Sequence, residues 1–210
     1  MNLVLVGLNH RTAPLALREQ FSLPACSIRA ALTELASFTL PDNNGQSTHP
    51  ADGYPFSSPK ISENIILSTC NRLEVYAITT GEAADGWQLI THYLSQLQGI
   101  SVDELHPHLY FMEGQEAVLQ LMRVAAGLDS MILGEPQILG QVSSAWAEAH
   151  GANSTGPILS HLFDGATHAG KRARTETEIG RHTTSISHAA ARLIADKVND
   201  IRQCHAAIIG

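Results

Sequence analysis

The first four strands that the hydrophobic pattern predicts all lie within the first 112 of the 210 residues. The predicted strands span residues 3–8, 64–68, 73–79 and 108–112. Apolar residues at helical spacing separate the first strand from the second and the third from the fourth, and they continue after the fourth. This order of strand, helix, two strands, helix and strand is typical of a split βαβ, ferredoxin-like domain, so we expect an α+β fold.

Between residue 130 and about residue 203 the pattern predicts helices alone. Pro136 fits the first turn of a helix that runs to about His150, and a second helix spans about residues 156–174. A third helix, from about residue 183 to 202, has one apolar stripe and therefore needs a partner surface in another domain or subunit. The last residues form an apolar strand that ends at Gly210, as the first strand of a Rossmann domain does before its glycine-rich turn.

These patterns divide the chain into four parts. We expect a first domain over residues 1–150, a helical extension over 151–182, a long linker helix over 183–203 and the first strand of a truncated Rossmann domain over 204–210. Residues 39–62 interrupt the first domain, because four prolines stand there among Asn, Gly, Ser, Thr and Asp. That composition predicts a flexible loop, and its length indicates an insertion.

Charge and cysteine usage exclude several classes of protein. A net charge of -7 argues against a nucleic-acid binder with a broad basic surface. Lys171, Arg172 and Arg174 form one basic cluster, which is either a solvated helix face or a local contact. The three cysteines form no Cys-x-x-Cys pair, and their odd number fits a reducing compartment, so we expect a cytoplasmic protein.

Metal and membrane signals are also missing from the sequence. The histidines are not spaced as a four-ligand set, so no metal site is predicted. The apolar runs are too short to cross a bilayer, and the N-terminus begins as a strand without a basic leader.

Cys70 is the first candidate for chemistry. It follows a predicted strand, and Arg72 comes two residues later, so in extended chain the two side chains would point the same way. A fixed positive charge beside a thiol favours the nucleophilic thiolate. The alternative is a small buried hydrophobic residue at a strand end, which is the commoner role of a cysteine taken alone.

Other polar residues gather around the predicted helix at Pro136. Gln137 and Gln141 share one face of it, and Ser130 and Glu135 precede it, where a helix N-terminus offers free backbone donors. His10 ends the first strand, where side chains often face a cleft. Taken singly, the glutamines fit the solvated side of an amphipathic helix and His10 fits a structural histidine.

Together these residues form a known pattern. The chain resembles glutamyl-tRNA reductases in four ordered segments, which are Gly7-Leu8-Asn9-His10-Arg11-Thr12-Ala13-Pro14, Ser68-Thr69-Cys70-Asn71-Arg72-Leu73-Glu74-Val75-Tyr76, residues 127–142 and residues 170–180. The resemblance covers the whole chain except residues 39–62, and the second and third segments are long and specific.

The resemblance implies a fold and an activity. Family members reduce glutamyl-tRNA(Glu) to glutamate-1-semialdehyde with NADPH, the first step toward 5-aminolevulinate and tetrapyrroles. Cys70 matches the cysteine that attacks the aminoacyl ester and forms a thioester. The predicted helix at 183–202 matches the family's spinal helix, Gly210 matches the start of the NADPH fingerprint, and the family implies a homodimer. The downstream aminomutase is a further expected partner.

The family's substrate-contacting positions also carry over. They match Thr69, Asn71, Arg72, Ser130, Glu135, Pro136, Gln137 and Gln141. Arg72 suits a substrate carboxylate because a guanidinium forms paired hydrogen bonds with one. His10 is an auxiliary catalytic candidate, and Lys171, Arg172 and Arg174 are candidate tRNA contacts.

The chain departs from the family in two ways. Many members have a histidine where this chain has Gln120, and a glutamine cannot exchange protons as a general acid or base. The NADPH and dimerisation domains are also absent from the 210 residues. We therefore expect at most slow hydrolysis of the ester through the thioester. The alternative is a natural short form that binds tRNA or a partner without catalysis.

Overall fold

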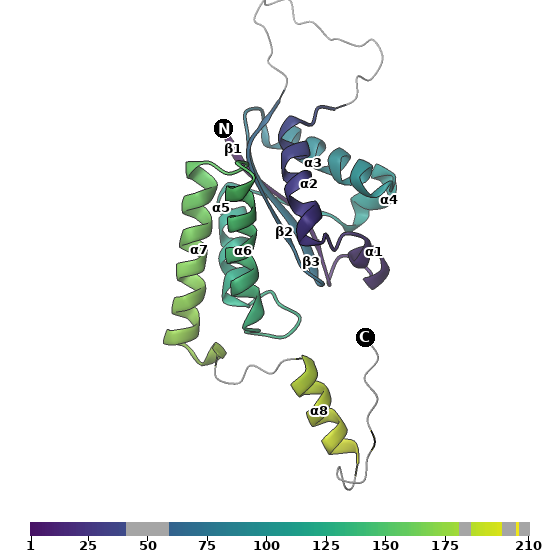
Figure 1. Ribbon diagram of the computed structural model, residues 1–210, viewed down its shortest axis with the longest axis vertical. Helices are drawn as coiled ribbons and strands as arrows, with labels where there is room; N and C mark the ends of the chain where they lie inside the picture. The colour runs from purple at the N-terminus through teal and green to yellow at the C-terminus, as the bar shows by residue number, and fades with distance from the viewer. Residues whose placement is uncertain (41–58, 181–185, 199–204, 206–210) are drawn as a thin grey trace, which may run out of the picture.

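A computed structural model describes residues 1–40, 59–180, 186–198 and 205. Its centre is one four-stranded antiparallel sheet with the strand order β2-β3-β1-β4 (Figure 1). The strands are β1 (Asn2–Asn9), β2 (Ile61–Ser68), β3 (Arg72–Thr79) and β4 (Tyr110–Glu113). β1 pairs with β3 and β4, and β2 pairs with β3, so the chain has the mixed α+β class expected from its sequence.

Helices cover both faces of this sheet (Figure 1). One face packs against α2 (Ala25–Ser37) and α3 (Ala83–Gln98), and the other against α5 (Gly114–Ala126), α6 (Gln137–Gly151) and α7 (Pro157–Glu176). The shorter helices are α1 (Leu15–Gln20), α4 (Val102–Leu105) and the 3₁₀ turns η1 (His106–His108) and η2 (Glu178–Gly180). Because both faces are covered, all eight residues of β3 are buried, including the charged residues Arg72 and Glu74.

The predicted boundaries need two corrections. β2 begins at Ile61 and not at Asn64, and it includes the buried Glu63. The carboxylate of Glu63 accepts the N–H groups of Ile158 at 3.2 Å and Leu159 at 2.8 Å, in the first turn of α7. A free helix N-terminus stabilises a buried negative charge, which allows a glutamate inside this strand.

The fourth strand begins at Tyr110 and not at His108. Residues 102–108 instead form α4 and η1, because the Ser101 side chain accepts the N–H of Glu104 and Pro107 fits a first helical turn. The helix predicted after Pro136 is confirmed as α6, with Pro136 as its N-cap.

The structure describes only some of the residues on which the C-terminal predictions fall. α8 (Ile186–Lys197) lies within the predicted linker helix, and Leu193 and Ile194 are exposed on it. The rest of that prediction, most of the predicted Rossmann strand with Gly210, and residues 41–58 of the predicted insertion lie outside the described residues. Within the described residues, no helix has both the length and the apolarity that a membrane crossing requires.

Candidate active site

Cys70 stands on a tight turn that joins β2 to β3. The N–H of Thr69 donates to the carbonyl of Arg72 at 2.9 Å, and the Thr69 hydroxyl accepts the N–H groups of Asn71 and Arg72, both at 3.2 Å. These bonds fold the four residues into a closed turn and leave Cys70 exposed on it. The alternative of a buried structural cysteine is therefore wrong.

A cation outside the family segments, Arg18, also holds this turn. The Arg18 side chain is buried and belongs to α1. Its Nη1 donates to the Cys70 carbonyl at 3.3 Å and to the Asn71 side-chain oxygen at 2.9 Å, and its Nε donates to the Ala13 carbonyl at 3.3 Å. Arg18 thus fixes the turn to the segment after β1. No periodicity could have revealed a contact across 52 residues of sequence.

Arg72 does not point toward Cys70 as a free cation. It is 2% exposed, and its Nη1 forms ion pairs with Glu74 at 2.6 Å and Asp129 at 3.0 Å. Its Nη2 donates to the Asp129 carbonyl at 2.5 Å. Burial opposes the charge on Arg72, but Glu74 and Asp129 outweigh it and raise the pKa of the guanidinium above its usual value. Both carboxylates are therefore charge partners of Arg72, and its positive charge is balanced within the chain.

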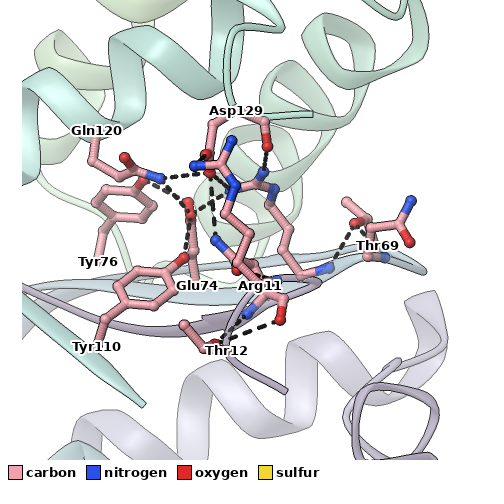
Figure 2. Close-up of polar contacts among 11 residues, drawn as sticks. Arg11, Thr12, Thr69, Glu74, Tyr76, Tyr110, Gln120 and Asp129 are labelled. Atoms are coloured by element: carbon pink, nitrogen blue, oxygen red, sulfur yellow. Dashed lines mark hydrogen bonds and ion pairs between the residues drawn. The ribbon is translucent and has the colours of Figure 1, made fainter. Parts of the chain in front are cut away.

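Glu74 is the centre of a buried polar network that lies between the sheet and α5 (Figure 2). It is 0% exposed and accepts hydrogen bonds from Arg72, Tyr76 at 2.7 Å, Tyr110 at 2.6 Å and Gln120 at 3.2 Å. Burial and the adjacent Glu74 carboxylate raise the pKa of both tyrosines well above the usual value. Both hydroxyls thus remain protonated donors, and the Glu74 carboxylate is fully satisfied.

Gln120 connects the two carboxylates of this network. Its side-chain nitrogen donates to Glu74 at 3.2 Å and to Asp129 at 3.0 Å. On its other side, Asp129 forms an ion pair with Arg11 at 3.0 Å. Two carboxylates and two guanidiniums make the set electrically neutral. Glu74 and Asp129 fall inside the family segments, but Asp129 and Arg72 are 57 residues apart in sequence, so only the fold reveals that they pair.

The loop between α5 and α6 supplies the other half of the candidate site. It closes with Cys70 around a pocket of about 20 Å³, room for roughly one water molecule. The pocket is lined by Thr69, Cys70, Asn71, Arg72, Ser130, Met131, Glu135, Gln137, Ile138 and Gln141. All but one of the predicted substrate-contacting residues therefore lie together. Pro136, the exception, is the N-cap of α6 beside them.

The Ser130 hydroxyl is buried and has no hydrogen-bond partner among the described residues. A buried hydroxyl without a partner is unfavourable, and it is a ready donor or acceptor for a molecule that enters the pocket.

Two glycines and one arginine hold this loop in place. Gly127 and Gly134 both have positive φ angles, 77° and 74°, and the N–H of Gly134 donates to the Gly127 carbonyl at 2.8 Å. Arg174 on α7 donates to the carbonyls of Gly134 at 3.0 Å and Glu135 at 2.6 Å. Arg174 therefore has a role within the chain that the sequence analysis did not consider.

The remaining predicted residues lie apart from the pocket. Lys171 and Arg172 are exposed, and Arg172 is paired with Glu176 at 2.9 Å one turn further along α7. His10 is half-buried and does not line the pocket. Its Nδ1 is buried without a partner among the described residues, and burial together with Arg11 and Arg72 lowers the pKa of its ring. Within the described part of the chain, no three His, Cys, Asp or Glu side chains gather as metal ligands.

Comparison with known proteins identifies the family. Residues 6–177 match the family described as "Glutamyl-tRNAGlu reductase, N-terminal domain". A glutamyl-tRNA reductase of Cyanothece sp. is 41% identical over all 210 residues, which cover 44% of that protein. One from Synechococcus elongatus is 44% identical over 198 residues, 94% of this chain and 40% of the relative.

A solved structure agrees with these relatives. The glutamyl-tRNA reductase from Methanopyrus kandleri is similar with a TM-score of 0.62 and 28% sequence identity, over 93% of this chain and 40% of that one. The chain thus spans less than half of the length of the relatives it matches. On the family match and these identities, the chain belongs to the glutamyl-tRNA reductase family and corresponds to its N-terminal domain.

Proposed function

We propose that Cys70 is the nucleophile that takes the glutamyl group from glutamyl-tRNA(Glu). The observation that carries this proposal is the placement of one exposed thiol on a fixed turn, beside a pocket lined by Ser130, Glu135, Gln137 and Gln141. The names of the relatives supply the substrate. Amide, carboxylate and hydroxyl groups of this kind are the partners that the ammonium and carboxylate of a glutamyl group require.

The proposed reaction is an acyl transfer. The Cys70 sulfur attacks the ester carbonyl carbon, a C–S bond forms, and the C–O bond to the terminal ribose breaks. The ribose oxygen takes up a proton, and the uncharged tRNA leaves. If water then attacks the thioester, the products are free glutamate and the restored thiol. For this chain we propose that slow hydrolysis.

Substrate recognition is proposed for Thr69, Asn71, Arg72, Ser130, Glu135, Pro136, Gln137 and Gln141. Arg72 lines the pocket although its two terminal nitrogens are engaged by Glu74 and Asp129. We therefore propose that Arg72 acts on the substrate as part of the pocket wall.

For the whole protein we propose the reduction of the thioester with NADPH to glutamate-1-semialdehyde, in a cytoplasmic homodimer that passes its product to an aminomutase. Gly210, the predicted start of the NADPH site, lies outside the described residues, so no step is derived through the cofactor. We also propose the ferredoxin-like class for the first domain, over residues 1–150. The β2-β3-β1-β4 order of the sheet supports it. The division into 151–182, the linker helix 183–203 and 204–210 remains our proposal, as does an auxiliary role for His10.

The test is the discharge of glutamyl-tRNA by the 210-residue chain. Cys70→Ser should reduce the rate of glutamate release to the uncatalysed level, and acid quenching should trap a glutamyl thioester only on the native chain. Cys26→Ser is the matched control, because Cys26 is the other exposed thiol of the described residues and lies on α2. If Cys70→Ser discharges the tRNA as fast as the Cys26→Ser control, Cys70 is not the nucleophile.

A further inference from the structure

A second and larger cavity lies on the other side of Asp129 from Cys70. It has a volume of about 600 Å³, within the range of ligand sites. Its lining comes from β1 and the segment after it, β4, α5 and the start of the α5–α6 loop. It shares no lining residue with the Cys70 pocket, but Asp129, which lines the cavity, is bonded to Arg72, which lines the pocket. The Arg72–Asp129 pair is thus the wall between the two.

The cavity has one positive charge in excess. Arg11 is bonded to Asp129, and Asp129 and Glu74 together are balanced by Arg72 and Arg11. Arg123 also lines the cavity, is exposed, and has no acidic partner among the described residues. In a chain of net charge -7, a solvent-exposed arginine beside a neutral network makes this cavity a local site for an anion.

Other groups in the cavity fit the rest of a nucleotide. Both N–H groups of Gln120 must face the carboxylates of Glu74 and Asp129, so its side-chain oxygen points away from them and has no partner among the described residues (Figure 2). That oxygen is an acceptor for a hydroxyl or an exocyclic amine. Met112 and the half-exposed Leu128 supply apolar surface for a flat base.

We propose that this cavity binds the terminal nucleotide of the tRNA, with its 5′-phosphate at Arg123 and its base against Met112 and Leu128. This inference rests on the proposed function, because the glutamyl group at Cys70 is esterified to that same nucleotide. The substrate would therefore lie across Asp129, with the acyl group on one side and the nucleotide on the other.

Binding of adenosine 5′-monophosphate tests the cavity without any reaction at Cys70. Calorimetry or chemical-shift titration should show AMP binding equally to the native chain and to Cys70→Ser, and roughly tenfold more weakly to Arg123→Gln. Arg29→Gln is the matched control, because it removes the same charge from α2, on the opposite face of the sheet, and should leave AMP binding unchanged.

Several results would overturn the assignment. One is no AMP binding to the native chain at millimolar concentration. A second is equal AMP binding to the native chain and Arg123→Gln. A third is inorganic phosphate that binds as tightly as AMP, because the cavity would then hold an anion and not a nucleotide. Adenosine without the phosphate should bind more weakly than AMP and should be insensitive to Arg123→Gln.

Kinetics separate this inference from the proposed function. Arg123→Gln should raise KM for glutamyl-tRNA roughly tenfold and leave Cys70-dependent hydrolysis of a 4-nitrophenyl ester of glutamate unchanged. If both substrates are affected equally, Arg123 supports the fold and not the nucleotide. If neither substrate reacts through Cys70 while AMP still binds in an Arg123-dependent way, the proposed function fails and the nucleotide site stands.

Discussion

Gln120 stands where the resemblance to glutamyl-tRNA reductases led us to expect a histidine, and its contacts explain how a glutamine fits there. A glutamine donates two hydrogen bonds from one nitrogen, and here each bond satisfies a different carboxylate, on Glu74 and on Asp129. A neutral imidazole has only one N–H group, so it satisfies both carboxylates only when it is protonated. In this chain Gln120 therefore positions Arg72 through the carboxylates and needs no proton exchange.

Gln120→His should make the stability of the chain depend on pH. The groups that face this position are Glu74, Asp129, Arg72, Tyr76 and Tyr110, and the carboxylates are the direct partners. They should raise the pKa of the new imidazole in the folded state. Its stabilising contribution is then complete below its unfolded pKa of about 6.5 and is lost as pH rises through the higher folded value.

Urea unfolding at about pH 6 and about pH 8 measures this change. Gln120→Leu is the control, because it removes both hydrogen bonds without adding a titrating group and should be destabilised equally at both pH values. An equal loss of stability for Gln120→His at the two pH values would contradict the argument.

The lowered pKa of His10 predicts a dependence of stability on pH with the opposite sign. Burial, Arg11 and Arg72 lower the pKa of His10 below its ordinary 6.5 in the folded chain. As pH falls below 6.5 the unfolded chain binds this proton first, so the folded state loses stability until pH reaches the lower folded value. The loss is at most about 1.4 kcal/mol per pH unit.

His10→Gln should remove that part of the loss. Urea unfolding of both chains from about pH 7.5 to about pH 5.5 checks it. If the two chains lose the same stability over this range, His10 is not held neutral by the fold.

At the scale of elements, the loop between α5 and α6 is the part of the site most sensitive to backbone change. A Cβ on Gly134 would collide with the Ile179 carbonyl, and its φ of 74° is strained for any other residue. Gly134→Ala should therefore displace the loop that carries Ser130 and Glu135. We expect a loss of more than about 1 kcal/mol in stability and a fall in Cys70-dependent discharge.

Gly140→Ala is the matched control for this prediction. Gly140 lies inside α6, and a Cβ there meets no atom within 4 Å. Alanine is favoured over glycine in a helix interior by about 1 kcal/mol, so this variant should be more stable than the native chain and equally active. Denaturant unfolding and the discharge assay on the pair test the argument. Equal behaviour of the two variants would show that the loop does not need its glycine conformation.

The order of the elements was largely readable from the sequence, and their exact ends were not. Periodicity located the four strands and the helices after them, because strands buried on both faces and amphipathic helices leave clear patterns. It missed Glu63, because a charged residue is normal inside a strand only when a distant helix end, here that of α7, neutralises it. The site followed a similar rule: the motifs pointed to Cys70, but not to its contact with Arg18 or to the pairing of Arg72 with Asp129, since those contacts join segments far apart in sequence.

At the scale of the whole molecule, the proposed binding of an acidic tRNA by an acidic chain predicts few phosphate contacts. The candidate cations are Arg123, Lys171 and Arg172. Three contacts to single-stranded phosphates give a slope of roughly −2 for log(kcat/KM) against log salt concentration. The rate of glutamyl-tRNA discharge at salt concentrations from about 50 mM to about 200 mM measures this slope. Hydrolysis of the 4-nitrophenyl ester of glutamate should show no such slope. A slope steeper than roughly −4 would mean a broader basic surface than we propose.

The buried pairing of Arg72 with Glu74 and Asp129 also limits how this protein can change over time. Removing one member of a buried ion pair typically costs about 3–5 kcal/mol, a large part of the stability of a small domain. A mutation of Arg72 that adapts the pocket to another acyl group therefore lowers the stability of the folded chain, and selection would act against it despite the new specificity. Acceptance of a different acyl group would require a second, compensating mutation at Glu74 or Asp129, so the three positions are expected to evolve together.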